Sequence, residues 1–534
     1  MKRIAAALPS LPSRPTLAAT LALVAAVVLV AGTAQRVAAQ DAVRAGAPGP
    51  GRPAAPAAAS ARTGARAASA PRFTPCRLEH PSRLLGFAAE CTTIEVAEDP
   101  ARPAGRRIAL FVARVPAVSR RKAADPVFLI AGGPGMGTTA MYPAVAAAFE
   151  RLRRDRDLVL LDQRGTGRSA PLGCALDDEQ LLEGSIAQVL EATRRCLAEL
   201  APRADLAQYT TSVAVRDLDA VRAALGYERI DLYGVSYGTR VAQHYLRRHA
   251  PHVRSVILDG VVPPGLALGP DMALDAEAAL QRILARCDAE PKCHGAFGDT
   301  DALYRGLRAR LAAAPVEVTL PDPVSARPRT LRFGERHLGA VLRLSSYASA
   351  QAALLPLALH EAATVGNFVP LAGLFLVANE GLREQLAYGM HNSVVCTEDL
   401  PFVDAAKVDR ARLAATYLGT EQLDALRAIC ATWPRGALDA DLRAPLRSEV
   451  PVLLLSGSDD PVTPPANAEA ARRGLAHSRH LVLPGQGHGQ VGASCMDRVF
   501  ADFVRSADPA RLDARCLQRV RPVPFFTSLA GPPP

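Results

Sequence analysis

The sequence predicts an α/β fold, with a mostly parallel central sheet, helices on both faces and a largely helical cap insertion. Apolar runs of strand length alternate with segments of helical periodicity up to residue 265, and this alternation returns after residue 444. Helical patterns dominate residues 266–443. Because strands that alternate with helices form parallel sheets covered on both faces, we expect one core built from 73–265 and 444–534, with a cap at 266–443.

Each element is predicted by its own pattern: strands by continuous or alternating apolar residues, helices by apolar residues three and four apart. The expected strands are TTIEV (92–96), RRIALFVARV (106–115), PVFLI (126–130), DLVLLD (157–162), RIDLY (229–233), the start of RSVILDGVVPPG (254–265), VPVLLLSG (450–457) and RHLVLPG (479–485). The expected helices are 212–226, 239–250, 464–475 and 493–507 in the core and 275–287 and 351–365 in the cap, which also holds one extended piece at 316–320.

The first 72 residues are not expected to join the core. Residues 1–39 read as a secretory signal peptide: basic residues precede an apolar stretch at 17–30, and a small-residue cleavage pattern ends at Ala39. We expect a secreted or periplasmic protein without stable membrane association after cleavage. An uncleaved anchor is the alternative, although the apolar stretch is short for a membrane span. Residues 40–72, rich in Ala, Pro and Gly, are expected to be a disordered tether.

The charge is concentrated in the same region. The net charge is +10, but residues 1–72 hold nine Lys and Arg against one Asp, which leaves +2 for the remainder. The folded part therefore gives no electrostatic reason to expect a nucleic acid partner.

The ten cysteines occur as near neighbours along the chain and fit an exported protein. Spacing alone does not fix their connectivity, and buried thiols are an alternative. No CxxC motif or Cys/His cluster has zinc-ligand spacing, so no metal site is expected. We predict five disulfides in sequence order: Cys76–Cys91, Cys174–Cys196, Cys287–Cys293, Cys396–Cys430 and Cys495–Cys516.

A serine lies between two glycines in GVSYGT (234–239), where an expected strand ends and a helix begins. A G-x-S-x-G stretch in this context is typical of a nucleophile elbow, a strained turn that exposes the serine. The positions two before and two after the serine must be small because strand and helix crowd there. Ser236 is therefore the candidate nucleophile, with a purely structural turn as the alternative.

A serine hydroxyl needs a base to take its proton and an acid to hold that base. His488 lies in LPGQGHGQ, a glycine-rich loop directly after an expected strand, and is the candidate base. His391 lies inside the cap, and the histidines on or just beyond helix 239–250 are more typical of structural roles. Asp459 and Asp460 follow the preceding strand. Either could be the acid, or could cap the next helix.

Acyl transfer also requires two backbone N–H donors for the oxyanion. Tyr237, directly after the nucleophile, is expected to supply one, and the loop AGGPGMG (131–137) the other. A dinucleotide-binding loop is the alternative. However, Thr138 stands where the third glycine of that motif belongs, and Pro134 has no N–H to offer a phosphate. We therefore expect no cofactor.

The motifs AGGPG, LDQRGTGRS and GVSYGT, followed by SDDPVTP and GQGHG, resemble the proline iminopeptidase and tripeptidyl aminopeptidase branch of the α/β-hydrolases. The resemblance covers nearly everything from about Cys76 to Cys516 and implies the α/β-hydrolase fold. In that family the acid directly precedes the PVTP-like segment, which favours Asp460. The family's second oxyanion donor corresponds to Gly133. The resemblance also implies a structural role beneath the active-site floor for three residues of DQRGTGRS: Asp162, Gln163 and Arg164.

One residue departs from the family pattern. The histidine that often opens the HGGPG loop is Ala131 here, so the resemblance does not imply strict proline specificity. The segments VVCTEDLP and CATWP instead resemble the secreted tripeptidyl-aminopeptidase-like subgroup. An aminopeptidase must bind a free α-ammonium, so Glu398 and Asp399 are candidate substrate-binding residues. A surface turn is the alternative for both. Trp433 is a candidate wall of the substrate pocket, with core packing as the alternative.

The sequence thus predicts an exported serine exopeptidase that acts on peptides with a free N-terminus. Ser236 would attack, His488 would carry the proton, Asp460 would orient His488, and Tyr237 and Gly133 would bind the oxyanion. The alternatives are a carboxylesterase with the same fold and triad, or an exported binding protein. No sequence feature indicates an oligomeric state.

Overall fold

The computed structural model describes residues 71–80, 85–174 and 185–532. Contacts divide the chain into two units, Met1–Ala67 and Ala68–Pro534. The predicted signal peptide at 1–39, and all but the last two residues of the predicted tether at 40–72, lie outside the described residues. Everything below concerns the second unit.

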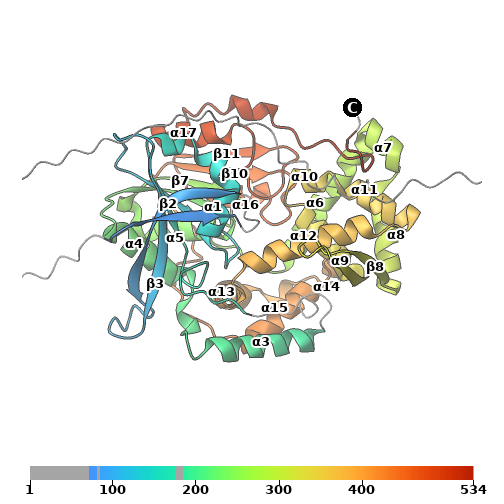
Figure 1. Cartoon of the computed structure of the whole chain (residues 1–534), viewed down its shortest axis with the longest axis horizontal. Coiled ribbons are helices and arrows are strands. Elements are labelled where there is room, and N and C mark those ends of the chain that lie inside the picture. Colours follow the sequence, from blue (N-terminus) through green and yellow to red (C-terminus); the bar gives the residue numbers. More distant parts are fainter. Residues whose placement is uncertain (1–70, 81–84, 175–184, 533–534) are drawn as a thin grey trace, which may run out of the picture. The chain divides into compact units, whose positions relative to one another are not determined.

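A nine-stranded sheet forms the centre of this unit (Figure 1). The strand order is β1-β2-β3-β5-β4-β6-β7-β10-β11, and every neighbouring pair from β5 to β11 is parallel, while β1, β2 and β3 pair antiparallel at one edge. The mostly parallel sheet predicted from the sequence is confirmed. Its strands are β1 Thr74–Glu79, β2 Gly86–Ala97, β3 Arg107–Val115, β4 Val127–Ile130, β5 Leu158–Leu161, β6 Ile230–Val235, β7 Val253–Asp259, β10 Val452–Gly457 and β11 Ser478–Leu483.

Helices cover both faces of the sheet. Successive strand residues point to opposite faces, so Phe128 and Ile130 of β4 join one apolar cluster, and Val127 and Leu129 join the other. Helices α4, α5 and α16 pack on the first cluster, and α1 and α17 on the second. The helices outside the cap are α1 Thr138–Val145, α3 Ile186–Leu200, α4 Thr211–Ala224, α5 Tyr237–His249, α16 Pro465–Arg472 and α17 Met496–Ser506, with 3₁₀ turns η1 Ala146–Phe149, η2 Leu152–Arg154, η3 Leu206–Gln208, η4 Ala250–His252 and η9 Arg515–Arg519.

The segment between β7 and β10 is largely helical, and we keep the name cap for residues 266–443. Its helices α6, α8, α9, α11 and α12 gather beside the sheet around a separate apolar core (Figure 1). The cap contains α6 Pro270–Ala289, α7 Pro291–Phe297, α8 Thr300–Ala313, β8 Val316–Pro321, β9 Pro328–Phe333, α9 Glu335–Ser345, α10 Ser349–Ala352, α11 Leu355–His360, η5 Glu361–Val365, α12 Val369–Gln385, α13 Tyr388–Val394, η6 Val395–Asp399, η7 Leu400–Phe402, η8 Ala405–Lys407, α14 Arg410–Ala414 and α15 Glu421–Thr432.

The structure adds two strands that the sequence did not lead us to expect. β1 pairs with β2 at the sheet edge, and β9 pairs with β8 to form a hairpin in the cap. Both strands bury few side chains: only Leu78 is buried in β1, and only Leu331 and Phe333 in β9. A strand with so few buried positions leaves a weak apolar alternation in the sequence.

A segment that follows η9 packs against the cap. Phe525 is buried among cap residues such as Ile283, and the guanidinium of Arg286 lies 4.8 Å from the centre of its ring. The backbone N–H of Phe526 donates a hydrogen bond of 3.1 Å to the carbonyl oxygen of Ala353. The second half of the core therefore holds the cap at a point remote in sequence from the cap's own two ends.

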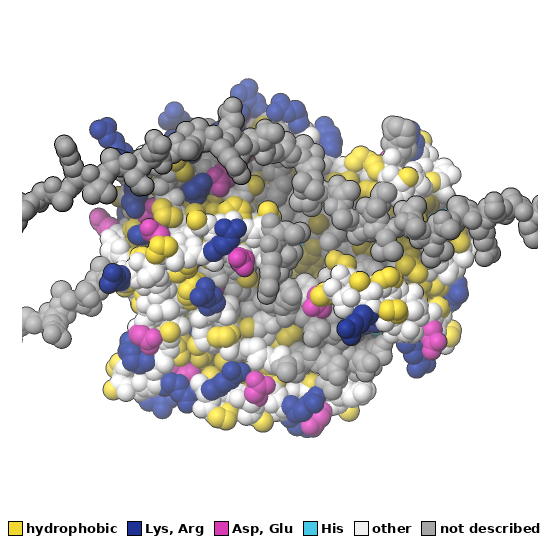
Figure 2. Space-filling view, in the orientation of Figure 1, with side chains coloured by type: hydrophobic (Ala, Val, Ile, Leu, Met, Phe, Trp, Pro, Cys, Tyr) yellow, Lys and Arg dark blue, Asp and Glu magenta, His cyan; other side chains and the backbone are white. Residues whose placement is uncertain are grey.

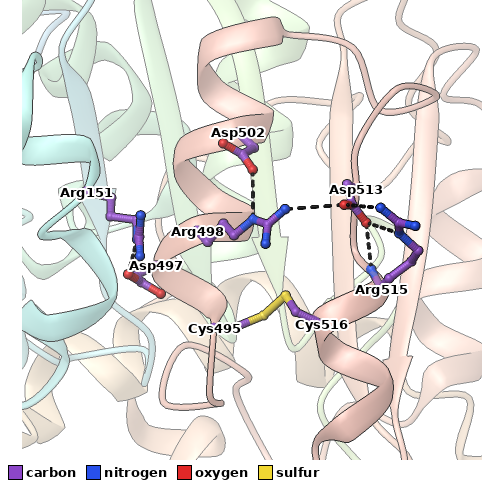
Figure 3. The surroundings of a disulfide bond; sticks show 8 residues. All are labelled: Arg151, Cys495, Asp497, Arg498, Asp502, Asp513, Arg515 and Cys516. Carbon is purple, nitrogen blue, oxygen red and sulfur yellow. Dashed lines mark hydrogen bonds and ion pairs between the residues drawn. A yellow bond between two sulfur atoms is a disulfide. The ribbon is translucent and has the colours of Figure 1, made fainter.

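All five disulfides are present in the predicted pairing. Figure 3 shows the last of them, which ties the residue before α17 to η9. Nearby, Asp513 accepts hydrogen bonds from both Arg498 and Arg515, so an ion cluster fixes the same two segments.

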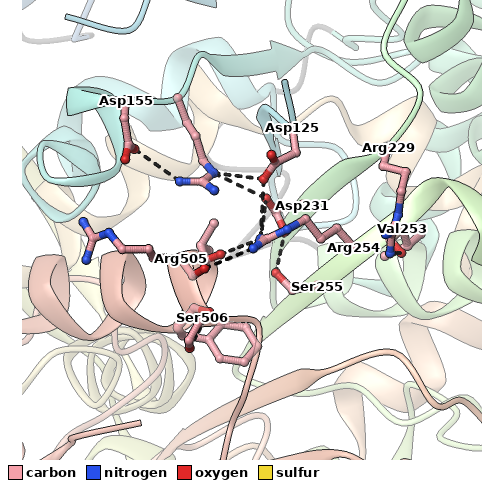
Figure 4. A network of polar contacts seen from close by, with 12 residues as sticks. Asp125, Asp155, Arg229, Asp231, Val253, Arg254, Ser255, Arg505 and Ser506 are labelled. Carbon is pink, nitrogen blue, oxygen red and sulfur yellow. Dashed lines mark hydrogen bonds and ion pairs between the residues drawn. The ribbon is translucent and has the colours of Figure 1, made fainter. Parts of the chain in front are cut away.

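A buried polar network lies at the start of β6 (Figure 4). Asp231 is 1% exposed, and its carboxylate lies 3.1 Å from Arg254 and accepts a hydrogen bond from Ser255. Burial, together with a hydrogen bond to Asp125, raises the pKa of Asp231 to about 7. Since Ser236 follows the other end of the same strand, this network supports the fold and takes no part in the chemistry described below.

On the face shown in Figure 2, Lys and Arg side chains lie among Asp and Glu side chains. Many surface charges are paired, as in the contact of 2.7 Å between Arg410 and Asp424. Within the described ranges, no helix combines the length and the apolar character needed to cross a bilayer.

Candidate active site

Ser236 occupies the tight turn between β6 and α5. Its backbone has φ 55° and ψ −126°, a conformation that side-chain-bearing residues rarely adopt. A Cβ on Gly234 would collide with the carbonyl oxygen of Gly238, and a Cβ on Gly238 with that of Ile130. The two glycines therefore let strand and helix approach closely enough to present the serine at the carboxyl edge of the sheet.

His488 and Asp460 form a hydrogen-bonded pair beside this turn. The imidazole Nδ1 lies 2.9 Å from Oδ2 of Asp460, which is fully buried at the end of β10. The carboxylate also accepts hydrogen bonds of 2.8 Å from the backbone N–H groups of Val462 and Thr463 and from the Thr463 hydroxyl. Because Nδ1–H donates to this carboxylate, Nε2 carries the free lone pair and can accept a proton.

The environment favours charge on both partners. Burial alone would lower the pKa of His488, but the charge and hydrogen bond of Asp460 outweigh burial and raise it. Burial would likewise raise the pKa of Asp460, but His488 and the backbone donors hold it below its usual value. The pair is therefore suited to an imidazole that gains a proton during the reaction and an aspartate that stays ionised.

Asp459, the other candidate acid, turns away from the histidine. Its carboxylate lies 3.4 Å from Arg286 and 3.7 Å from Arg282, both on cap helix α6. Of the two neighbouring aspartates, the structure brings Asp460 to His488.

Ser236 and His488 both lie next to the backbone of Asp259 and Gly260. The backbone N–H of Ser236 donates to the carbonyl oxygen of Asp259 (2.9 Å), and a Cβ on Gly260 would lie 3.0 Å from the imidazole Cε1. Across the described residues, no hydrogen bond joins the Ser236 hydroxyl to His488. The structure thus contains the predicted hydrogen bond between His488 and Asp460. It also places Ser236 beside the Asp259–Gly260 backbone that His488 contacts. In many enzymes the nucleophile–base contact tightens only when substrate binds.

The side chain of Asp259 is a second buried carboxylate at this site, and the sequence analysis did not identify it. It accepts the backbone N–H of Gln490 at 2.7 and 2.9 Å and the hydroxyl of Tyr233 at 3.0 Å. Burial raises its pKa to about 6. Because Gln490 lies two residues after His488, this carboxylate holds the loop that carries the base. In the sequence, the only indication of a role for Asp259 was its position at the end of an expected parallel strand.

Two backbone N–H groups are free beside Ser236. Tyr237 begins α5, so its N–H has no partner from a preceding helical turn. The structure assigns no hydrogen-bond acceptor from the described residues to the N–H of Tyr237 or of Gly133. The loop that contains Gly133 lies close: a Cβ on Gly132 would be 2.9 Å from the Ser236 Cβ. These positions fit the predicted oxyanion donors.

Ser236 opens into a narrow pocket between core and cap, which we call the acidic pocket. Gly133, Ser236 and Tyr237 line it from the core. From the cap it is lined by apolar residues such as Leu268 and Met272 and by three carboxylates: Asp271, Asp275 and Asp399.

Only one of the two predicted ammonium-binding carboxylates reaches this pocket. Asp399 lines it from η6, a single π-helical turn, and accepts hydrogen bonds from Arg240 (2.7 Å) and the Leu268 backbone (3.1 Å). Glu398 is fully buried behind it and accepts the Thr211 backbone N–H (2.6 Å) and hydroxyl (2.7 Å). Burial raises the pKa of Glu398 to about 7, against the charge of Arg240. The expected contact of Glu398 with substrate is therefore corrected: it anchors the pocket wall.

Asp271 and Asp275 were missed by the sequence analysis. They lie one turn apart on α6, so both point from the same face of the helix. Neither forms an ion pair with another described residue. Burial, followed by repulsion from Asp271 and Asp460, raises the pKa of Asp275 to about 6. Their spacing of four was a signal, but the sequence did not show which face of α6 meets the nucleophile.

Trp433 does not line the acidic pocket. Its side chain is 2% exposed, belongs to the apolar cluster beside the sheet, and donates from Nε1 to the Ser393 hydroxyl (3.0 Å). The structure therefore supports core packing, the alternative to a substrate-binding wall.

The DQRG segment has the supporting role that the resemblance implied. The Asp162 carboxylate accepts hydrogen bonds from the Thr139 backbone and hydroxyl, both at 2.8 Å. Arg164 is fully buried and binds both carboxylate oxygens of Asp217, at 2.6 and 2.8 Å. The Asp162 contacts tie the segment after β5 to the start of α1, and the Arg164 contacts tie it to α4.

The arrangement can perform acyl transfer. It offers a strained serine, an imidazole held by a buried carboxylate, and two free N–H groups where a tetrahedral oxyanion would develop. Within the described ranges, no group of three or more His, Cys, Asp or Glu side chains is arranged to hold a metal ion.

Comparison with known proteins agrees with this arrangement. Residues 125–288 match the alpha/beta hydrolase fold family, and residues 415–516 match the TAP-like protein family. The first match contains the turn at Ser236, and the second contains Asp460 and His488.

Curated relatives include peptidases and an esterase. The serine protease Hip1 of Mycobacterium tuberculosis is 26% identical over 83% of this chain and 90% of that protein. A tripeptidyl aminopeptidase of Streptomyces lividans is 32% identical over 33% of this chain and 36% of that protein. A carboxylesterase B of M. tuberculosis is 28% identical over 80% of this chain and 86% of that protein.

Proposed function

The chain belongs to the α/β-hydrolase family of serine peptidases that includes tripeptidyl aminopeptidases, and from this premise we propose that it is an exported aminopeptidase that cleaves short peptides from a free N-terminus. The signal-peptide pattern at 1–39 and the five disulfides support export.

The proposed reaction proceeds through an acyl-enzyme. Ser236 attacks the scissile carbonyl while Nε2 of His488 takes its proton, and Asp460 stabilises the imidazolium. The N–H groups of Tyr237 and Gly133 bind the oxyanion. His488 then protonates the departing amine, and water, activated by the same imidazole, hydrolyses the ester on Ser236.

The observation that carries the free-N-terminus assignment is the presence of unpaired carboxylates in the nucleophile's own pocket. Arg240 already balances Asp399, at 2.7 Å, whereas Asp271 and Asp275 form no ion pair with a described residue. A substrate ammonium would supply the missing positive charge through charge-assisted hydrogen bonds. An ester without an amine would supply no such positive charge.

The test compares one chromogenic peptide amide with a free N-terminus against its N-acetylated form. The free amine should be hydrolysed with a kcat/KM at least about tenfold higher, because a charge-assisted hydrogen bond contributes about 1.5–3 kcal/mol. The Ser236→Ala variant should abolish hydrolysis of both. Equal rates on the two substrates would remove the basis for an aminopeptidase.

A carboxylesterase is the second candidate, favoured by the relative named carboxylesterase B. The same triad hydrolyses esters, which have better leaving groups than amides. Simple acyl esters without an amine separate the two functions: an esterase should cleave them with a higher kcat/KM than any peptide that has a free N-terminus.

A further inference from the structure

A second, larger hollow of about 510 Å³ lies between cap helices and α3, and we call it the arginine cavity. It shares no lining residue with the acidic pocket. Helices α9, α12 and α15 and the first residue of α13 line it from the cap, and Ile186 and Val189 of α3 line it from outside the cap. Among the residues that line it are Arg343, Tyr347, Phe375, Tyr388, Tyr417 and Leu418.

The arginine cavity borders the catalytic histidine. The ring of Tyr347 meets the imidazole of His488 edge to face, with centroids 5.0 Å apart. The backbone N–H of His488 donates to the carbonyl oxygen of Tyr347 at 2.8 Å. Another wall residue, Tyr388, follows Leu386 by two residues, and Leu386 forms a backbone bridge with Met136 of the oxyanion loop.

This position has a consequence for the leaving group. After Ser236 attacks, His488 must protonate the departing amine, so the peptide beyond the scissile bond lies on the histidine's side. Tyr347, a wall residue of the arginine cavity, packs directly against His488. Its tyrosine and phenylalanine walls offer apolar surface for side chains of the departing peptide.

The charges that line the cavity are balanced, with one exception. Arg336 pairs with Glu421 at 2.6 Å. Asp424 pairs with Arg410, at 2.7 Å, from outside the cavity. Among the described residues, Arg343 donates only to the neutral side chain of Gln422, at 2.9 Å. No carboxylate of the described residues pairs with it.

Arg343 is also close to the reaction centre. It precedes Tyr347 by four residues at the end of α9. Asp460 raises the pKa of His488 against the effect of burial, and the charge of Arg343 offsets part of this increase. The charge of Arg343 therefore acts on the imidazole of His488.

We propose that the arginine cavity binds the leaving part of a short peptide, and that Arg343 binds its terminal carboxylate. The guanidinium fork matches a carboxylate in shape and charge. This inference rests on the proposed aminopeptidase function and narrows its substrate class. With unpaired carboxylates in one pocket and an unpaired guanidinium in the other, the enzyme is complementary to short peptides whose two termini are both free.

The test uses two pentapeptides of identical sequence with free N-termini, one ending in a carboxylate and the other in an amide. We expect kcat/KM to be about tenfold to a hundredfold higher for the carboxylate, mostly through KM. In Arg343→Gln the ratio between the two substrates should fall to about one, and in Arg343→Lys it should stay intermediate. Arg305→Gln removes a charge from the cap outside the cavity and should keep the wild-type ratio.

The outcomes separate this inference from the proposed function. An arylamide with a free N-terminus, which has no peptide leaving part, reports the aminopeptidase activity alone. If the wild type cleaves it but does not distinguish the two pentapeptides, the carboxylate site is wrong and the proposed function stands. A preference that survives in Arg343→Gln also overturns the inference, and failure to cleave any of these substrates overturns both. The wild-type comparison needs no variant, so a poorly folding variant would not leave the question open.

Discussion

Replacing Asp275 by Asn separates the role of this residue in function from its effect on stability. The change keeps the size of the side chain and removes one negative charge from the acidic pocket, while Ser236, His488 and Asp460 are untouched. If Asp275 binds the substrate ammonium, the loss of one charge-assisted hydrogen bond, about 1.5–3 kcal/mol, should lower kcat/KM about tenfold to a hundredfold on substrates with a free N-terminus.

The effect on stability should have the opposite sign. The pKa of Asp275 is raised to about 6 by burial and by its acidic neighbours, so the folded state prefers the protonated form. An ionised Asp275 therefore reduces the free energy of unfolding, and this cost is fully present above about pH 6. The whole shift corresponds to about 3 kcal/mol, which partial exposure to solvent reduces to ~1–2 kcal/mol. Asp275→Asn should be more stable than the wild type by that amount at pH 8.

Two measurements check this pair of expectations. Thermal unfolding at pH 8 should show a Tm about 1–2 °C higher for Asp275→Asn, and the difference should shrink towards pH 4, where the wild-type carboxyl is protonated. Kinetics at pH 8 should show the loss on the free amine and little change on its N-acetylated form. Asp301→Asn, a cap variant outside the pocket, serves as the control. An unchanged kcat/KM on the free amine, or an equal loss on both substrates, would refute the reasoning.

Three further variants test the rest of the site. In the wild type, kcat/KM should rise with pH with a midpoint at the raised pKa of His488, because only the neutral imidazole is a base. In Asp460→Asn the midpoint of this pH profile should move to lower pH, and kcat should fall about 10³–10⁴-fold. Asp259→Asn should weaken the hold on the loop of His488 and remove a nearby negative charge, so kcat should fall while KM on the same peptide stays within about twofold. Replacing Cys396 and Cys430 by Ser opens a 34-residue loop and should lower the free energy of unfolding by about 3–4 kcal/mol, as measured by denaturant titration.

Local sequence predicted the tight turn at Ser236, and the structure confirms the sequential pairing of the cysteines, which spacing alone did not fix. The turn at Ser236 depends on Gly234 and Gly238, whose missing side chains are visible in the sequence itself. Strands β4, β5 and β6 are buried on both faces of the sheet. They therefore have continuous apolar runs, from which the sequence predicted them as strands. The choice between Asp459 and Asp460 needed a family resemblance, because both follow the same strand.

The side chains that line the acidic pocket could not be assigned in this way. Asp271, Asp275 and Glu398 are all acidic residues on helical segments, and only the docking of the cap decides which of them faces the nucleophile. Trp433 presented the same difficulty, since a large aromatic residue suits a core as well as a pocket. Periodicity predicts that a helix has an inward face, but not which cavity that face meets.

The contact between Phe525 and the cap limits how the enzyme can open. A cap joined to the core only at its two ends could rotate as a rigid body. Here a further segment contacts the cap, since Phe525 packs against Ile283 and lies beneath Arg286. A large rotation of the cap would expose the Phe525 ring to water. Access to Ser236 that leaves this contact in place requires local shifts of the cap helices, and such access suits unfolded chain ends better than the surface loops of folded proteins.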